Sequence, residues 1–274
     1  LMAAGVTVAA IIDPRPDAFS VEDCPVHVGA EVIGSRGRLG LRGITVRKGS
    51  ETFEVETDCL AMSGGWNPTI HLTCHMNGRP RWSEELAAFV PMEGAVPGLV
   101  AVGAANGSFS THGALVTGHA AGLRAVEALG RKVSVAVPEA EDMPYRVKAL
   151  WAVEGKGRAW LDFANDVTTK DVKLAAQEGF RSVEHMKRYT TQGMAPDQGK
   201  NSNVAALAVL ADATGRGIAE TGVTTFRPPY TPVSIAAMGA GGRAEGFAPQ
   251  RFLTSDQASR DRHAPMIEAG LWYR

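Results

Sequence analysis

The stretch from Phe180 to Asn203 has the residue types of a small cofactor site. It reads FRSVEHMKRYTTQGMAPDQGKNSN, with a helix start at Ser182, then basic side chains, two threonines and a glycine-rich loop. It contains no cysteine. The pattern therefore predicts the frame of a cofactor site without a thiol ligand to fill it.

A second candidate is Asp13, which follows an apolar run. Residues 6–12 read VTVAAII and predict a buried strand of the parallel-sheet type, after a helix end closed by Gly5. An acidic residue in this place accepts hydrogen bonds from a ribose in dinucleotide-binding units. The glycine fingerprint of such a unit lies about 20 residues upstream, before the first residue of this sequence. Asp13 therefore either contacts a ribose or only ends a strand.

Gly64 and Gly65 mark a further place for close approach. They follow a predicted strand, Cys59 to Ser63, in the run DCLAMSGGWNP. Paired glycines after a buried strand allow a ligand or another backbone to come near. Before them, we expect a meander of short strands at residues 26–34, 37–48 and 52–62. The glycine pair alone is weak evidence for a ligand site. It gains weight from a glycine-rich turn that follows later in the chain.

That turn lies in GLVAVGAANGSFSTHGALVTGHAAG. A strand is predicted at Leu99 to Val102, a tight turn at Gly103 to Ser108, and a helix at about Phe109 to Leu129. One side of this helix carries only glycine and alanine, so it should pack closely on a sheet. The amino end of the helix offers free N–H groups and a positive dipole end, which suit a pyrophosphate. The same strand–turn–helix arrangement also occurs with no ligand.

Composition limits the class of protein. The chain has 274 residues, of which 45% are hydrophobic and 21% charged, and its formal net charge is -1. This balance fits a globular protein of roughly two domains and favours neither nucleic acid nor a membrane surface as partner. No apolar run reaches the roughly 18 residues of a membrane helix. Three widely spaced cysteines and a start without the marks of a signal peptide predict a cytoplasmic protein.

Metal and hydrolase motifs are absent from the sequence. His71, Cys74 and His75 are close in sequence but lack a second ligand pair at zinc-site spacing. His112 and His119 are more consistent with packing or solvent contact than with catalysis. We find no GxSxG or HExxH element and no convincing pair of carboxylates for acid–base catalysis. We therefore assign no metal site and no catalytic residue.

The second half of the chain predicts three short helices after a polar, proline-bearing linker. The helices are expected in VTTKDVKLAAQEG, SVEHMKRYT and NVAALAVLADATG, capped at Thr168 and Ser182 and closed at Gly179 and Gly215. The linker is followed by YRVKALWAVEGKGRAWLDF, which reads as strand-like.

Several of these segments resemble one family. The chain resembles the alpha subunits of heterotetrameric sarcosine oxidases in the segments LDFANDVTTKDV, EGFRSVEHMKRYTTQGMAPDQGKNSN, TTFRPPYTPVS, SGGWNPTIHL and VGAANGSFS. The resemblance runs nearly end to end and implies a central fragment of such a subunit. It implies an α/β fold: part of a two-dinucleotide-binding (Rossmann-like, FAD/NAD-type) domain, then a small helical module resembling a 2Fe–2S-binding domain without its cysteines.

The resemblance also implies a domain division. RFLTSDQASRDRHAPMIEAGLWYR resembles the opening of a folate-binding aminomethyltransferase-like domain. The expected parts are the dinucleotide domain at 1–130, a linker at 131–158, the helical module at 159–243 and the start of the folate domain at 244–274.

In related amino-acid dehydrogenases the helical module holds an iron–sulfur cluster. Laid on this sequence, the four ligand positions of that pattern fall on Asp162, Ala164, Asp197 and Ser202. A 2Fe–2S cluster of this type needs four thiolates, and alanine has no donor atom. We therefore expect the frame without the cluster. A solvent-facing helical linker is the alternative.

By the same resemblance, the chain is expected to bind NAD and to contact FMN at the interface with the beta subunit. FMN would meet the stretch around the glycine-rich loop, where basic side chains neutralise its phosphate. Gly103-Ala104 replaces the Gly-Asp pair frequent in flavin-binding turns, which favours NAD there. The NAD contacts are Asp13, Gly64, Gly65, Gly103, Ala104, Phe109 and Thr111. The FMN contacts are Lys187, Arg188, Thr190, Thr191, Gly193 and Lys200.

The resemblance implies an activity for the complex. Sarcosine is oxidised at FAD in the beta subunit, hydrogen peroxide is formed, and the one-carbon unit passes to tetrahydrofolate. The implied partners are beta, gamma and delta subunits, with amine oxidation itself outside this chain. Two alternatives remain open. One is a subunit of a related dehydrogenase acting on dimethylglycine, proline or hydroxyproline. The other is a non-catalytic NAD-binding assembly subunit.

Overall fold

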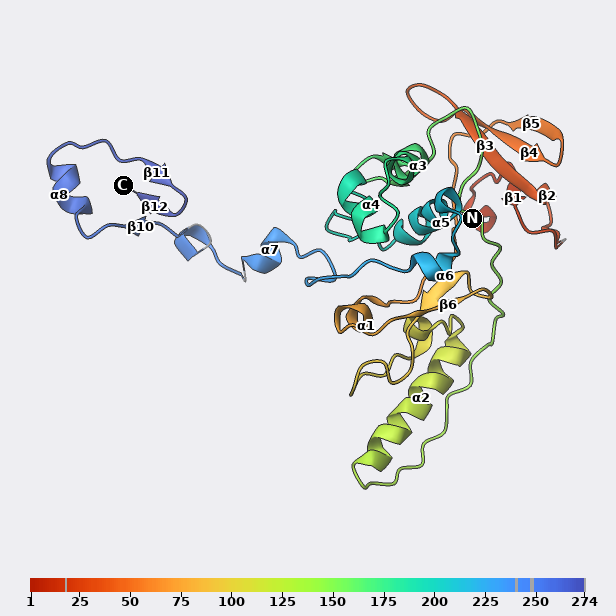
Figure 1. The fold of residues 1–274 in the computed structure, drawn as a ribbon, viewed down its shortest axis with the longest axis horizontal. Coiled ribbons are helices and arrows are strands. Elements are labelled where there is room, and N and C mark those ends of the chain that lie inside the picture. Colours follow the sequence, from red (N-terminus) through yellow and green to blue (C-terminus); the bar gives the residue numbers. More distant parts are fainter. Residues whose placement is uncertain (18, 240, 247–248, 274) are drawn as a thin grey trace. The chain divides into compact units, whose positions relative to one another are not determined.

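The computed structural model describes residues 1–17, 19–239, 241–246 and 249–273. The chain forms two compact units, Leu1–Tyr230 and Thr231–Arg274 (Figure 1). The strands of the first unit are β1 (Ile11–Asp13), β2 (Val26–Val28), β3 (Ala30–Arg36), β4 (Gly43–Lys48), β5 (Glu51–Val55), β6 (Arg81–Ser83), β7 (Ala88–Val90), β8 (Trp160–Asp162) and β9 (Val167–Thr168). Its α-helices are α1 (His71–His75), α2 (Thr111–Ala128), α3 (Thr169–Gln177), α4 (Val183–Thr190), α5 (Asn203–Thr214) and α6 (Ile218–Thr221).

The amino-terminal part is built from short strands. β1 pairs in parallel with β2, and β3, β4 and β5 form an antiparallel meander, as the alternating sequence predicted. Val46 is fully buried at the centre of the meander, in a small apolar core with Ala30 and Ile44. The strand expected at residues 6–12 is shorter than predicted, because only its last residues find a neighbour to pair with.

Two predicted strands are wrong, and a third strand-like run is confirmed only near its end. Cys59 to Ser63 and Leu99 to Val102 have no strand pairing in the structure, and in the run from Tyr145 to Phe163 only β8 is paired, with β9. A strand is stable only when a neighbouring strand accepts its backbone hydrogen bonds, and no strand pairs with the unpaired runs in the part of the chain that the structure describes.

The predicted turn and helix after Leu99 are present in a modified form. A 3-10 turn covers Gly103–Asn106, and α2 follows it. None of the residues of α2 is buried, so the close packing on a sheet that its small residues predicted does not occur among the described residues.

The three predicted helices of the second half are confirmed. The Asp171 carboxylate accepts hydrogen bonds from the backbone N–H and the hydroxyl of Thr168, both at 2.7 Å, which fixes the start of α3. The Ser182 hydroxyl accepts from the His185 N–H at the start of α4. Gly215 ends α5 in the left-handed conformation, with φ 68°.

The main core lies between these helices. Val172 of α3, Met186 of α4 and Leu207 and Leu210 of α5 are almost completely buried together. Phe89 of β7 lies in the same core. The ring of Trp82 in β6 packs edge-on against the Phe89 ring, with 5.1 Å between the ring centroids. Because Phe89 and Trp82 come from the amino-terminal half, this core joins that half to the three helices. The first compact unit therefore continues to Tyr230 and does not end at the boundaries expected at residues 130 and 158. The four-part division therefore stays a prediction.

The second unit is small. It contains α7 (Ile235–Met238), a 3-10 turn (Ala244–Gly246), α8 (Asp256–Asp261) and a sheet in the order β10 (Arg251–Phe252), β12 (Trp272–Tyr273), β11 (Glu268–Ala269). Arg274, the last residue of the expected folate-type segment, lies outside the described residues. No helix in the described part of the chain is long and apolar enough to cross a membrane.

Candidate functional site

Asp13 is buried at the end of β1, and Arg15 binds both of its carboxylate oxygens. The Arg15 backbone N–H donates at 2.9 Å, its Nε at 3.0 Å and 3.1 Å, and its Nη2 at 2.5 Å. These hydrogen bonds lower the pKa of Asp13, against the opposing effect of burial. A ribose hydroxyl would therefore compete with a guanidinium for this carboxylate.

Replacing Arg15 with alanine is expected to raise the pKa of Asp13. With Arg15 present, the lowered pKa contributes stability above the pKa of the unfolded chain, and this stability is lost as the pH falls through the folded pKa. The variant should therefore unfold at a higher pH than the native protein during acid titration. Urea unfolding between pH 2 and 7 measures the difference. Equal acid sensitivity in the two proteins would contradict the assignment.

Residues 142–148, here named the crossing segment, bring several predicted contacts together. The Tyr145 hydroxyl accepts a hydrogen bond from the Trp66 N–H at 2.9 Å, beside Gly65. Its ring lies 4.5 Å from the ring of Phe109. A Cβ on Gly65, which has φ 83°, would stand 2.5 Å from the Tyr145 hydroxyl, so the glycine allows a close approach by protein. Sequence reasoning placed this segment in the expected linker at 131–158 and interpreted the part from Tyr145 on as strand-like, and it missed these contacts.

The amino end of α2 is also occupied by the crossing segment. The cap is Ser110, whose hydroxyl accepts from the Gly113 N–H at 2.9 Å and donates to Asp142 at 2.6 Å. Thr111 and Ala104 are exposed, and the Gly103 N–H donates to Thr117 at 3.0 Å. The Asp142 carboxylate thus lies near the positive amino end of α2, where a pyrophosphate was predicted to bind.

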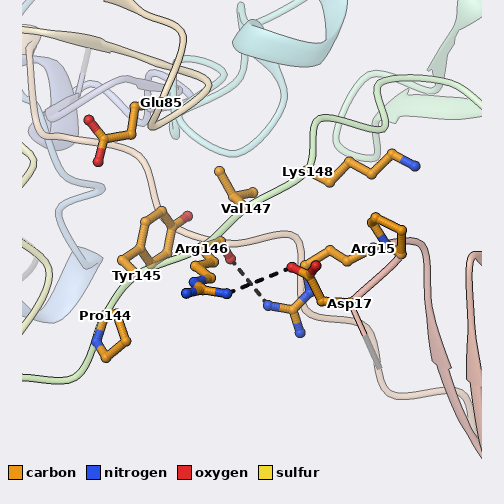
Figure 2. Close-up of a pocket in the computed structure, with 9 residues that line it drawn as sticks. Arg15, Asp17, Glu85, Pro144, Tyr145, Arg146, Val147 and Lys148 are labelled. Carbon is orange, nitrogen blue, oxygen red and sulfur yellow. Dashed lines mark hydrogen bonds and ion pairs between the residues drawn. The ribbon is translucent and has the colours of Figure 1, made fainter. Parts of the chain in front are cut away.

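An open cavity of about 680 Å³ lies between the chain after β1 and the crossing segment. Figure 2 shows its lining, which includes Arg15, Asp17, Tyr145, Arg146 and Lys148. Lys148 Nζ donates to the Pro14 carbonyl at 3.0 Å, which ties the two walls together. The cavity therefore adjoins Asp13, the predicted ribose contact, and its rim is rich in cations.

The frame predicted in the helical module is held by hydrogen bonds. The buried Asp162 carboxylate accepts from the backbone N–H groups of Ala164, Asn165 and Gly193, at 2.9, 3.1 and 2.8 Å. The Asn165 side chain adds a bond to the Thr191 carbonyl at 3.0 Å. Asp162 therefore joins the turn after β8 to the glycine-rich loop.

Gln192 and Asn203 continue this network inside the loop. Gln192 Nε2 donates to the Ser202 hydroxyl at 2.7 Å. Asn203 Nδ2 donates to the Gln198 carbonyl at 3.0 Å and to the Thr224 hydroxyl at 3.1 Å. Gln192 is 1% exposed. The loop is therefore organised around buried amide side chains, which the sequence pattern did not indicate.

The residues at the cluster positions do not fit an iron–sulfur cluster. Asp162 is saturated by backbone N–H groups, Ser202 is bound by Gln192, and Ala164 has no donor atom. Asp197 is the fourth position, and one of its oxygens is buried without a hydrogen-bond partner in the described part of the chain. Within the same residues, no group of three or more His, Cys, Asp or Glu side chains is arranged to hold a metal ion.

The predicted FMN contacts differ in availability. Arg188 is paired with Glu184 at 2.6 Å. The Thr190 hydroxyl donates to the Met186 carbonyl at 2.8 Å, and the Thr191 hydroxyl donates to the Thr190 carbonyl at 2.6 Å. The Gly193 N–H is used by Asp162. Two members, Lys187 and Lys200, form none of the ion pairs found among the described residues.

Lys187 and Lys200 lie among further basic groups from distant segments. Burial lowers the pKa of Lys187, and Arg188 and Arg227 lower it further against the raising effect of Glu184. Burial also lowers the pKa of His71, to which Lys200 adds. Gln198 binds the Arg227 backbone on both its N–H and carbonyl sides, at 2.8 Å and 2.6 Å. Sequence reasoning did not connect His71 or Arg227 with this loop.

Known proteins similar to this chain place these features in context. Residues 156–242 match the sarcosine oxidase A3 domain family. By structure, 77% of the chain superposes on 44% of L-proline dehydrogenase from P. horikoshii, with a TM-score of 0.55 and 18% sequence identity. The fold is therefore an α/β fold shared with an amino-acid dehydrogenase.

The sequence relatives are more specific. Sarcosine oxidase subunit alpha of Rhizobium meliloti (strain 1021) is 41% identical over the whole chain, and that of Corynebacterium sp. (strain P-1) is 34% identical over the whole chain. The chain spans 28% and 31% of their lengths. The chain belongs to the family of sarcosine oxidase alpha subunits and corresponds to a part of their length.

Proposed function

We propose that this chain works within the alpha subunit of a complex that oxidises sarcosine to glycine, forming hydrogen peroxide and passing the one-carbon unit to tetrahydrofolate. The observation that carries the proposal is 41% identity over the full chain to a protein named sarcosine oxidase subunit alpha. Beta, gamma and delta subunits would complete the complex. No residue of this chain is assigned to the oxidation of the amine.

The test is oxygen uptake by the complex purified with its partner subunits. With sarcosine, we expect oxygen consumption and peroxide formation, and a tetrahydrofolate-bound product only when tetrahydrofolate is added. Activity confined to another secondary amine would contradict the proposed substrate. No activity on any amine, together with bound NAD, would support the assembly-subunit function instead.

One alternative has a specific observation in its favour. A structurally similar protein is named an L-proline dehydrogenase, so a proline-type or dimethylglycine substrate belongs in the same assay. The structural similarity covers the fold only, whereas the sequence identity to sarcosine oxidase subunits is about twice as high. This difference is the reason for ranking sarcosine first.

We also propose that the first unit is the later portion of a two-dinucleotide domain, in which this chain binds NAD. The glycine turn before α2 and the face beside Asp13 would hold it. Support comes from the crossing segment, which draws Gly65 and Phe109 to one place. Both nearby carboxylates already accept hydrogen bonds from protein groups, Asp13 from Arg15 and Asp142 from Ser110. Binding of NAD at this place would require these hydrogen bonds to be exchanged for hydrogen bonds with the ligand.

For FMN, the proposal rests on Lys187 and Lys200. The flavin phosphate would lie beside the glycine-rich loop, where it could be neutralised by Lys187 and Lys200, which form no ion pair among the described residues. FMN supplies electron transfer when bound, and the residues of this chain hold its phosphate. The same loop explains the retained frame: the buried amides keep its shape without a cluster.

Replacing Lys187 with alanine is expected to weaken FMN binding by about tenfold, because one charge-assisted contact to phosphate is lost. The measurement is the FMN content of the purified complex, with reconstitution to obtain a dissociation constant. Lys173→Ala is the control, since it removes the same charge from the exposed face of α3. Equal flavin content in both variants would contradict the proposed role of Lys187.

A further inference from the structure

Residues 224–230, here named the proline segment, hold α1 against the glycine-rich loop. Gln198 of the loop donates its Nε2 to two carbonyls of this segment, at 2.6 Å and 3.0 Å. On the other side of the segment, the Tyr230 ring packs on the ring of His71 in α1, with 5.0 Å between the centroids. His71 therefore lies beside the loop that carries Lys200, although the two residues are far apart in the chain.

The imidazole of His71 is partly buried and keeps both ring nitrogens available. His75, the other histidine of α1, has its Nδ1 at 3.2 Å from the Phe226 carbonyl oxygen, whereas neither nitrogen of His71 forms a hydrogen bond in the described part of the chain. Burial lowers the pKa of His71, and the Lys200 ammonium lowers it further. His71 is therefore a neutral side chain at neutral pH, with one free donor and one free acceptor.

The groups that surround His71 are rich in cations. Lys200 comes from the loop, Arg227 from the proline segment and Lys187 from α4, where Arg227 contributes to the lowered pKa of Lys187. These three cations form none of the ion pairs found among the described residues. Hydrogen bonds to Gln198 fix the Arg227 backbone at both its N–H and its carbonyl. Like charges are therefore held close together by the fold.

Two carboxylates in the same segments leave this charge in place. Glu184 is already bound, with Arg188 at 2.6 Å from one oxygen and the Thr225 N–H donating to the other at 2.8 Å. Asp197 forms no ion pair in the part of the chain that the structure describes, and one of its oxygens is buried there without a partner. A dianion placed among these cations would be attracted by all of them.

We propose that His71 is a further phosphate-binding residue of the FMN site, neutral while the site is empty and protonated by solvent when the phosphate binds beside Lys200. A dianion next to the imidazole favours the charged ring and offsets the repulsion from the lysine. The imidazolium then donates a charge-assisted hydrogen bond to a phosphate oxygen. The inference rests on the proposed binding of FMN at this loop.

Uptake of a proton sets the direction of the pH dependence. Binding that takes up a proton weakens as the pH rises between the lowered pKa of His71 in the empty site and its higher pKa in the occupied site. The second pKa of a phosphate monoester is about 6, so FMN itself changes charge only slightly above about pH 6.5. The affinity for FMN relative to riboflavin, which lacks the phosphate, should therefore fall about tenfold between about pH 6.5 and 8.5.

The experiment is calorimetric titration of the flavin-free complex with FMN and with riboflavin, in two buffers of different ionisation enthalpy. At about pH 7.5, FMN should bind with uptake of about half a proton more than riboflavin. His71→Gln should remove this difference and the pH dependence, and its unchanged affinity for riboflavin shows that the variant folds. His185→Gln removes an exposed imidazole from α4 and is the matched control, which should behave as the native complex does.

The outcomes separate this inference from the proposed function. FMN binding by the native complex without the additional proton uptake overturns the inference and leaves the FMN function standing. That measurement needs no variant, so a misfolded His71→Gln protein does not prevent a decision. Uptake that persists in folded His71→Gln, or that is lost equally in His185→Gln, assigns the proton to another group and also overturns the inference. A complex that binds FMN at no pH contradicts the proposed function itself.

Discussion

Replacing Asp162 with alanine is expected to lower the free energy of unfolding of the first unit by roughly 3 kcal/mol. Three backbone N–H groups lose their acceptor at once, and the one on Gly193 is buried. Each unsatisfied buried polar group costs about 1–3 kcal/mol. Protection of backbone amides from hydrogen exchange should fall most at the glycine-rich loop, because the Asp162 carboxylate joins the Gly193 N–H to the turn after β8.

Urea unfolding and hydrogen exchange of the loop amides measure this effect. Asp166→Asn is the matched control, because it removes a carboxylate from the same turn. Asp166 is exposed and accepts no side-chain hydrogen bond in the described part of the chain. If the two variants have the same stability, Asp162 does not hold the loop.

Replacing Gly199 with alanine is expected to cost roughly 3 kcal/mol or more. Its φ of 70° disfavours any side chain, and a Cβ there would stand 2.1 Å from Asn203 Oδ1. Asn203 cannot move aside easily, since its amide is buried and bound to the Gln198 carbonyl and the Thr224 hydroxyl. The substitution therefore adds a clash to the backbone strain.

The matched control is Gly215→Ala at the end of α5. Its φ is 68°, almost the same, but nothing lies within 4 Å of the added Cβ. This variant should lose only about 1–2 kcal/mol, which is the strain of the left-handed conformation alone. The difference between the two variants measures the contribution of the Asn203 contact. Equal losses of stability would show that the loop rearranges around a side chain at residue 199.

Local signals in the sequence predicted the helical module well. Thr168 and Asp171, Ser182 and the closing Gly215 lie within a few residues of the backbone groups that they satisfy. Capping of this kind depends only on neighbours in sequence, so the pattern is sufficient to locate a helix. The absence of four thiolates at the cluster positions was equally visible from residue types alone.

Strand predictions were less reliable, because a strand depends on a partner elsewhere in the chain. The apolar run Leu99 to Val102 resembles a buried strand, yet it has no pairing neighbour in the described residues. The meander from β3 to β5 was predictable because its partners follow one another directly, joined by short polar turns.

The sequence by itself determined the family, the capped helices and the absence of cysteine from Asp162, Ala164, Asp197 and Ser202. Each of these depends on residue identity or on contacts between near neighbours. Only the tertiary structure decided what surrounds the candidate residues: Arg15 on Asp13, Tyr145 beside Gly65 and Phe109, and buried amides inside the glycine-rich loop. The Tyr145 hydrogen bond joins residues 79 apart in the chain, and such a pairing arises from packing, which no local pattern encodes. Arg15 lies only two residues from Asp13, but the sequence pattern did not indicate which side chain would bind this carboxylate.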